Sequence, residues 1–229
     1  MQEMRRNLEQ VRLNIASACR RTGRDPGEVV LVAVTKTCPV AAIEQAISLG
    51  IGIVGENRVQ EASEKYQHIG DKVEWHLIGH LQSNKARKAV EMFSVIHSID
   101  SVELAAEVGR RALQQGKVQD VLLEVNTSGE PQKYGFTPQV VGGDIGKIGA
   151  IGGLRVLGLM TVGPLTDDED RIRGSFKMLR TLFEQIRDQA LPNIEMKHLS
   201  MGMSGDYQIA IEEGSTMIRV GSAIFGARG

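Results

Sequence analysis

"VVLVAVTKTCPVAAIEQAISLGIGIVG", residues 29–55, shows the pattern that repeats along the chain. The apolar run at 30–36 predicts a buried strand. The stretch 40–50 is helical in composition and ends in glycine, and residues 51–55 predict a second strand. Two strands joined by a single helix indicate a βαβ unit with parallel strands. This stretch therefore predicts an α/β fold.

The same alternation continues to the end of the chain. Eight parallel strands within 229 residues predict a single closed (β/α)8 barrel of the TIM type. An open doubly wound sheet is the alternative. We prefer the barrel because of the strand count and because no G-x-G-x-x-G motif follows the first strand. The later strand segments are 73–79, 95–100, 118–126, 154–163, 194–202 and 215–226, and the helical segments between them are 58–70, 84–93, 102–116, 137–153, 169–191 and 205–214.

An extra helix is predicted before the first strand. Leu8, Val11, Ile15 and Ala18 recur at helical spacing, and no apolar core of a signal peptide is present. The chain shows no linker, low-complexity segment or block of like charge. We therefore expect one domain over residues 1–229.

The composition narrows the class of protein. Hydrophobic residues make up 41% of the chain and the formal net charge is -1, which does not favour nucleic acid or an anionic membrane as a partner. Cys19 and Cys38 are too few for a disulfide framework, and no apolar run is long enough to span a bilayer. We expect a cytoplasmic protein without a nucleic-acid or membrane partner.

A lysine closes the first strand, at the end where barrel enzymes place their active sites. If Lys36 points inward, Val34 and Val32 do so as well, because side chains alternate along a strand. Burial in that apolar column would lower the pKa of the lysine, and a neutral amine reacts with carbonyl groups. The alternative is a lysine that simply extends into solvent.

Two loops near the C-terminus are rich in glycine and serine. They follow strands seven and eight, where such barrels bind phosphate, and they read "HLSMGMSGDY" and "IRVGSAIFG". Gly202 and Gly221 would let the backbone approach a ligand, and Ser200, Ser204 and Ser222 offer hydroxyl groups. Ordinary turns are the alternative explanation.

A lysine for a carbonyl and a cradle for a phosphate at one barrel mouth indicate pyridoxal 5'-phosphate as cofactor. Arg219 lies on strand eight, in the row that could face inward. A guanidinium is always protonated, so against the pyridine nitrogen it would keep that nitrogen unprotonated and make the cofactor a poor electron sink. A buried or paired arginine without this role is the alternative.

Seven motifs in order give the chain a family resemblance. "AVTK", "GENRVQE", "WHLIGHLQSNK", "EVNTSGEPQKYGF", "GLMT", "LSMGMSGD" and "IRVGSAIFG" together resemble the pyridoxal phosphate homeostasis proteins, small barrels related to the barrel domain of alanine racemase. The resemblance implies a Schiff base between the cofactor and Lys36, and a role in vitamin B6 and amino-acid homeostasis. The other cofactor-binding residues that it implies are Asn57, Ser200, Met201, Gly202, Arg219, Gly221 and Ser222.

Catalytic turnover is not expected. A racemase needs an acid or base on each face of its substrate, and the related racemase takes its second one, a tyrosine, from a further domain and a dimer. This chain ends after strand eight, and Tyr134 is the best substitute, although it could merely cover the barrel mouth. We expect a monomer, with a weak dimer as the alternative. A slow amino-acid racemase or decarboxylase, and a Schiff-base aldolase acting on a sugar phosphate, are the other functions to consider.

No metal site is expected. His76 and His80 are four residues apart, but they fall on a strand and the loop after it, and no third ligand accompanies them.

Overall fold

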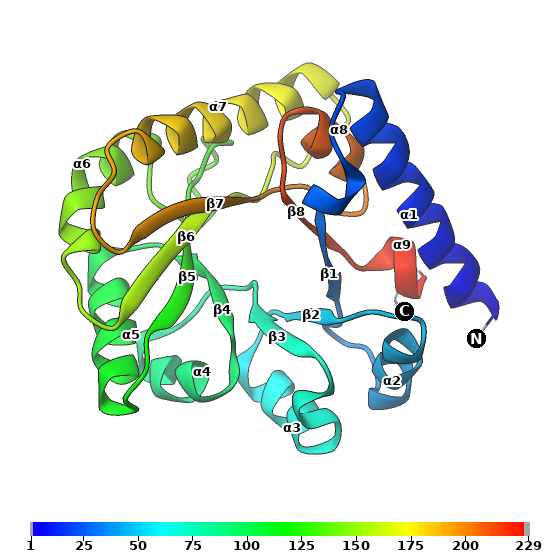
Figure 1. Cartoon of the computed structure of the whole chain (residues 1–229), viewed down its shortest axis with the longest axis horizontal. Coiled ribbons are helices and arrows are strands. Elements are labelled where there is room, and N and C mark those ends of the chain that lie inside the picture. The colour runs from blue at the N-terminus through cyan, green and yellow to red at the C-terminus, as the bar shows by residue number, and fades with distance from the viewer. Residues whose placement is uncertain (1, 227–229) are drawn as a thin grey trace.

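The strands form a closed parallel barrel in the order β1 to β8 within residues 2–226, the part of the chain that this computed structural model describes. Figure 1 shows the barrel with its helices around the outside. The predicted barrel is therefore confirmed, and the open sheet is excluded because β1 pairs with β8. The strands are β1 (Val30–Val34), β2 (Ile53–Glu56), β3 (Glu74–Leu77), β4 (Val95–Ile99), β5 (Gln119–Glu124), β6 (Leu154–Met160), β7 (Ile194–Ser200) and β8 (Met217–Val220).

A helix follows each strand, and one more precedes the first. The prediction differs at the last strand, because β8 ends at Val220 and the short helix α9 occupies most of the rest of the segment 215–226 that was predicted as strand. Three short 3-10 turns supplement these helices at Pro26–Glu28, Gly70–Lys72 and Ser83–Lys85. The helices are α1 (Gln2–Arg21), α2 (Val40–Ser48), α3 (Val59–Ile69), α4 (Ala86–Met92), α5 (Val102–Gln114), α6 (Pro138–Gly149), α7 (Glu169–Arg187), α8 (Tyr207–Glu212) and α9 (Ser222–Phe225).

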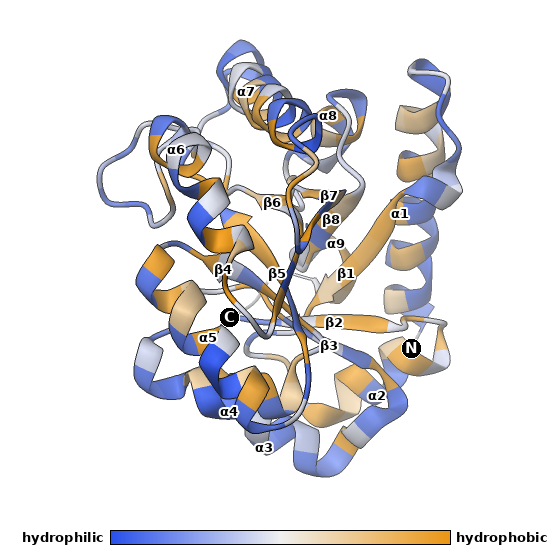
Figure 2. Ribbon diagram, turned by 60° about the vertical axis from the view of Figure 1, so that its left-hand side comes forward, coloured by the Kyte–Doolittle hydropathy of each residue, from blue (hydrophilic) through white to orange (hydrophobic). Residues whose placement is uncertain are grey.

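Local sequence explains where several of these helices begin. Ser101, Thr137 and Asp168 stand at the N-caps of α5, α6 and α7, and each side chain accepts a hydrogen bond from a backbone N–H of the first turn. The central strands are apolar, and the helices carry apolar stripes on otherwise hydrophilic surfaces (Figure 2). Helices on the outside and side chains on the inside thus bury both faces of the sheet, as a parallel sheet requires.

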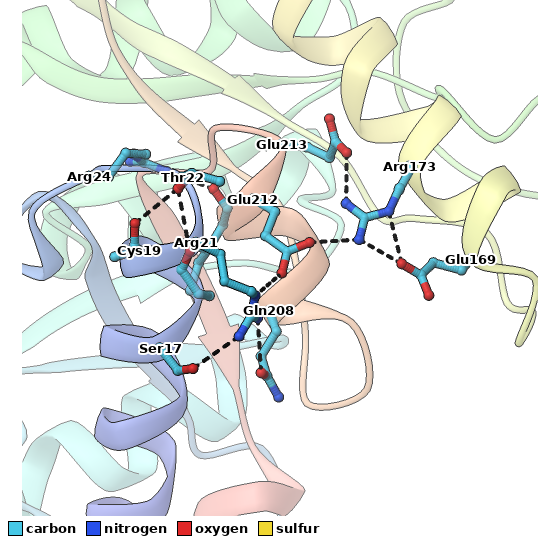
Figure 3. A network of polar contacts seen from close by, with 12 residues as sticks. Ser17, Cys19, Arg21, Thr22, Arg24, Glu169, Arg173, Gln208, Glu212 and Glu213 are labelled. Carbon is cyan, nitrogen blue, oxygen red and sulfur yellow. Dashed lines mark hydrogen bonds and ion pairs between the residues drawn. The ribbon is translucent and has the colours of Figure 1, made fainter.

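An ion-pair network joins α1 to α7 and α8 (Figure 3). Arg21 of α1 binds Glu212 of α8 with an Nε–Oε1 distance of 2.6 Å. Arg173 of α7 binds the same Glu212 at 2.6 Å, Glu213 at 2.9 Å and Glu169 at 2.6 Å. The first helix of the chain is therefore fastened to elements from its last third.

The barrel interior is apolar in part and polar in part. Glu124 lies two residues beyond the interior Leu122 on β5, so it faces the same side of the strand. Burial raises the pKa of Glu124 to about 7, although the nearby Arg219 guanidinium acts in the opposite direction. The apolar residues of this interior cluster are Val32, Val95, Leu122, Leu157, Met160 and Met217.

A buried lysine links β2, α3 and the end of β1. Lys65 Nζ lies 2.7 Å from a carboxylate oxygen of Glu56 and 2.7 Å from one of Glu61. It also donates a hydrogen bond to the carbonyl of Thr35 at 2.7 Å, and the Thr35 hydroxyl donates to Glu56 at 2.6 Å. The amide of Thr37 donates to Glu61 at 2.5 Å. Both residues that flank Lys36 are thus anchored to one buried ion cluster.

No helix among residues 2–226 combines the length and the apolar character needed to cross a membrane.

Replacement of Lys65 tests the cost of breaking this ion cluster. In Lys65→Met, Glu56 keeps its fully buried carboxylate but loses the cation beside it, so we expect a loss of about 3 kcal/mol in the free energy of unfolding. Urea denaturation measures it. The control is Lys147→Met, which removes a lysine paired with Asp144 on the surface of α6 and should cost less than about 0.5 kcal/mol. Equal losses in the two variants would contradict the expectation.

Glu124 predicts a pH-dependent stability. Its pKa of about 7 in the folded protein lies above the ordinary 4.5, so the folded state holds the proton more tightly between these values. This group stabilises the fold below pH 4.5, and the contribution is lost as the pH rises to about 7, amounting to about 3 kcal/mol. Glu124→Gln removes the ionisation, so the stability of the variant relative to the natural chain should rise over this range.

Unfolding at several pH values measures this difference. Glu64→Gln, which removes an exposed carboxyl group of α3, is the control. A constant difference between Glu124→Gln and the natural chain from pH 4.5 to 8 would contradict the raised pKa.

Candidate functional site

A cavity of about 460 Å³ opens at the C-terminal end of the barrel. Five of the eight predicted cofactor-binding residues line it, and they come from β8 and from the segments that follow β1, β2 and β8. Its apolar walls come from the ends of β1, β3 and β6 and the loop after β7. These five are Lys36, Asn57, Arg219, Gly221 and Ser222. The other lining residues are Ser204, whose hydroxyl group the sequence also indicated, and Val34, Ile78, Val162, Met203 and Gly205.

Lys36 lines this cavity, but it is not buried. β1 ends at Val34, and Lys36 lies beyond it with an exposed side chain. The expectation of an amine desolvated by an apolar column was therefore wrong, because the strand stops before the lysine and the barrel mouth is open there. The predicted alternation is confirmed, since Val32 packs in the barrel interior and Val34 lines the cavity.

The backbone beside Lys36 is held in an unusual conformation. Thr37 has a φ of 62°, in the left-handed region that β-branched residues rarely occupy. Its amide hydrogen bond to Glu61 and the anchoring of Thr35 by Lys65 maintain this turn. Strain of this kind is kept where the surrounding structure compensates for it, which is common at functional sites. The amine is thus placed by a rigid turn and not by burial.

Arg219 is the buried cation of the site. Its Nη1 donates to the carbonyl and the hydroxyl of Ser200 at 2.7 and 2.6 Å, and its Nη2 donates to the carbonyl of Thr161 at 2.7 Å. Burial lowers the pKa of Arg219 to about 10, and the carboxyl groups of Glu124 and Asp206 act against that shift. The guanidinium therefore stays charged at neutral pH, is fixed in orientation, and presents a positive charge to the cavity.

Three residues predicted to contact the phosphate do not line the cavity. Ser200 is the last residue of β7 and binds Arg219, and Met201 is fully buried in the core. Gly202 has a φ of 97°, and a Cβ there would lie 2.5 Å from the Cβ of Ala210. The close packing of α8 thus requires a glycine at this position. None of the three is among the residues that line the cavity.

Ser204 joins the two glycine-rich loops. Its hydroxyl oxygen accepts hydrogen bonds from the backbone N–H groups of Gly221 and Ala223, at 3.2 and 3.3 Å. Asp206 holds the Ser204 loop in place, because its side chain accepts a hydrogen bond from the amide of Met203 at 2.6 Å. Two backbone donors therefore converge on one oxygen at the edge of the cavity.

Several residues of the site were missed from the sequence, although a signal was present. Glu56 and Glu124 each end an apolar strand with a charge, which is the feature that singled out Lys36. Ile78 lies two residues after the inward-facing His76, and Val162 two after the interior Met160, so strand alternation indicates both.

A second cavity of about 670 Å³ adjoins the first and shares Asn57 with it. Tyr134 lines this second cavity and stacks on His80, with 3.9 Å between ring centroids and 13° between the ring planes. Tyr134 is not among the residues that line the cavity of Lys36. His80 pairs with Asp100 at 3.1 Å, while His76 faces the barrel interior. Across residues 2–226, no group of three His, Cys, Asp or Glu side chains could hold a metal ion.

Comparison with known proteins relates this fold and site to one family. The family model described as the alanine racemase N-terminal domain matches residues 6–229. The pyridoxal phosphate homeostasis protein of Aquifex aeolicus is 39% identical over 222 residues, which cover 96% of this chain and 96% of that protein.

Two solved structures are similar over nearly the whole chain. A crystal structure of an unknown protein from Bifidobacterium adolescentis has a TM-score of 0.92 and 39% identity, and the match covers 97% of this chain and 94% of that one. PipY of Synechococcus elongatus PCC7942, solved with PLP bound, has a TM-score of 0.81 and 38% identity, with 93% of this chain and 100% of that chain covered. The chain therefore belongs to the pyridoxal phosphate homeostasis protein family, whose barrel is that of the alanine racemase N-terminal domain.

Proposed function

We propose that this protein binds pyridoxal 5'-phosphate in the cavity at the barrel mouth, with Lys36 as its covalent anchor. The observation that carries the proposal is that one cavity contains a primary amine, a buried guanidinium and the two glycine-rich loops. The relative PipY, which is 38% identical, has a structure with PLP bound. The name of the Aquifex aeolicus relative places that protein in pyridoxal phosphate homeostasis, and for this chain we propose a role in vitamin B6 and amino-acid homeostasis.

The residues present fit each part of the cofactor. The N–H groups of Gly221 and Ala223, which converge on the Ser204 hydroxyl, would bind a phosphate oxygen more strongly, because an anionic acceptor strengthens a hydrogen bond. Ile78 and Val162 offer apolar walls to a flat ring. When bound, the cofactor supplies an aldehyde that combines with an amine and a conjugated ring that accepts electrons.

Each proposed binding residue then has a distinct task. Lys36 provides the amine for the Schiff base, and Asn57 borders the ring from the end of β2. Arg219 would donate a hydrogen bond to the pyridine nitrogen. Ser222 and Gly221 would bind the phosphate. Ser200, Met201 and Gly202 support the site without lining the cavity. Ser200 orients Arg219, Met201 packs in the core, and the backbone of Gly202 accepts a hydrogen bond from the Arg219 amide at 3.0 Å.

Binding without substrate turnover is part of the proposal. Arg219 keeps its proton at neutral pH, because even its lowered pKa is about 10. It therefore does not protonate the ring nitrogen, and an unprotonated ring is a weak electron sink. Tyr134, the tyrosine best placed in sequence to act as a second acid or base, lines the neighbouring cavity instead. We further propose that residues 1–229 work as one domain, as a monomer in the cytoplasm.

Removal of the amine tests the anchor. After reduction with borohydride, mass spectrometry of peptides should find a cofactor adduct on Lys36 in the natural chain and none in Lys36→Ala, which should also lose the visible absorbance of the bound cofactor. Lys85→Ala is the matched control, because Lys85 lines the adjoining cavity. A full adduct in Lys36→Ala would show that another lysine is the anchor.

The absence of turnover is tested in deuterated water. With L-alanine and other amino acids, the loaded protein should exchange the α-proton no faster than free cofactor does, because Arg219 leaves the ring a weak electron sink. Proton NMR follows the exchange. Clearly faster exchange, abolished by Lys36→Ala, would favour a slow racemase instead.

A further inference from the structure

A relay of hydrogen-bonded polar side chains crosses the barrel interior below the cofactor cavity. It runs from Arg219 to Ser200, then to His97 and His76, and ends at Glu74 at the start of β3. The heavy-atom distances along it are 2.6, 3.1, 2.9 and 3.0 Å. Because β3 begins at Glu74, the relay extends from the N-terminal end of the barrel to the cavity at the opposite end.

The chemistry of the partners fixes which atom donates and which accepts in each hydrogen bond of this relay. A guanidinium can only donate, so the Ser200 hydroxyl oxygen accepts from Arg219 and its own proton is donated to His97 Nδ1. Burial lowers the pKa of His97 well below the ordinary value, and His76 and Arg219 lower it further. His97 is therefore neutral. Its single proton is then on Nε2 and is donated to His76 Nδ1.

The last step ends on a carboxylate. Since His76 accepts at Nδ1, its proton lies on Nε2 and is donated to Glu74. That hydrogen bond lowers the pKa of Glu74, so Glu74 is ionised at neutral pH and can only accept. Each donor in the series therefore points from the cation toward the anion.

The relay helps to balance the buried positive charge of Arg219. Within residues 2–226, no carboxylate lies within ion-pair distance of the buried Arg219, and its direct partners are two carbonyls and one hydroxyl. Buried charges are normally paired. A chain of hydrogen bonds polarised by Glu74 makes Ser200 a better acceptor for the guanidinium.

Other titratable groups surround the relay without joining it. The carboxyl groups of Glu124 and Asp206 act on the charge of Arg219. His198 of β7 faces His76 and Glu74, and burial lowers its pKa. The remaining charged groups near His198 are Asp120 of β5 and Lys197 of β7. His198 Nδ1 has no hydrogen-bond partner among the described residues, so it provides no competing route.

We infer that Glu74, His76 and His97 are positioning residues of the cofactor site, which act through Ser200 to fix Arg219 where it faces the ligand. The relay itself is a property of the protein without cofactor, while its effect on the cofactor rests on the proposed function. The relay and its effect on the cofactor are tested by separate measurements.

The first measurement uses protein without cofactor, labelled with ¹⁵N. Long-range ¹H–¹⁵N spectra should show both His76 and His97 protonated at Nε2 near neutral pH. In Glu74→Gln the relay loses its terminal charge, so resonances should shift at His76, at His97 and at the Arg219 guanidinium, although only His76 touches Glu74. Glu74 is 45% exposed, so this variant leaves the core intact.

The control is Glu195→Gln, which neutralises a comparably exposed carboxylate, paired with Lys197 on β7. It should leave His97 and Arg219 unchanged. A proton on Nδ1 of either relay histidine in the natural chain, or shifts confined to His76 in Glu74→Gln, would overturn the relay.

The second measurement uses protein loaded with pyridoxal 5'-phosphate. Glu74→Gln should shift the visible absorbance maximum of the bound cofactor, and Glu195→Gln should not. An unchanged maximum in Glu74→Gln would overturn the effect on the cofactor. A relay seen by NMR in a protein that never acquires visible absorbance would instead show that the relay is correct and that the proposed function is wrong.

Discussion

The site depends on one buried lysine that is not in the cavity. Lys65 lies between Glu56 and Glu61 and holds the carbonyl of Thr35, while Glu61 holds the amide of Thr37. The backbone on both sides of the exposed Lys36 is therefore held by one ion cluster. The protein separates two tasks that a lysine can perform, since one amine is buried to fix the backbone and the other is left accessible. The arrangement explains how an exposed side chain can still be well oriented.

A second consequence concerns the electrostatics of the cavity. The fold provides a permanent cation in Arg219 and directs backbone N–H groups to the region of Gly221 and Ser204. Both favour an anionic ligand. Two carboxyl groups act on this cation, those of Glu124 and Asp206. Burial raises the pKa of Glu124 to about 7 and also raises the pKa of Asp206. Burial thus disfavours the ionised form of both acids, which favours a positive potential around Arg219.

The sequence predicted the barrel, the extra helix and much of the cavity for a simple reason. Each strand is an apolar segment with glycine-marked helices on either side, and barrel geometry gathers all the strand ends at one mouth. Lys36 and Arg219 therefore could be associated although 183 positions separate them. The same rule would have found Glu56 and Glu124, had every charged strand end been considered.

Other features could not be read from the sequence because they depend on where a strand stops. β1 stops two residues before Lys36, which leaves the lysine exposed, whereas β7 continues to Ser200 and turns that serine into the barrel. A shift of one or two residues exchanges a ligand contact for an internal hydrogen bond. The positive φ of Thr37 has no sequence signal, because it is imposed by Glu61 from a different element.

The attachment of α1 has a consequence for how the chain is made. Arg21 is synthesised 191 residues before its partner Glu212. β1 likewise pairs with β8, so the barrel has no complete wall until the last strand is available. Contacts between such distant segments form slowly. Although β1 can pair with β2 soon after both are made, it must wait for β8, and Arg21 must wait for Glu212, so closure of the barrel and assembly of the cavity at its mouth become one late event.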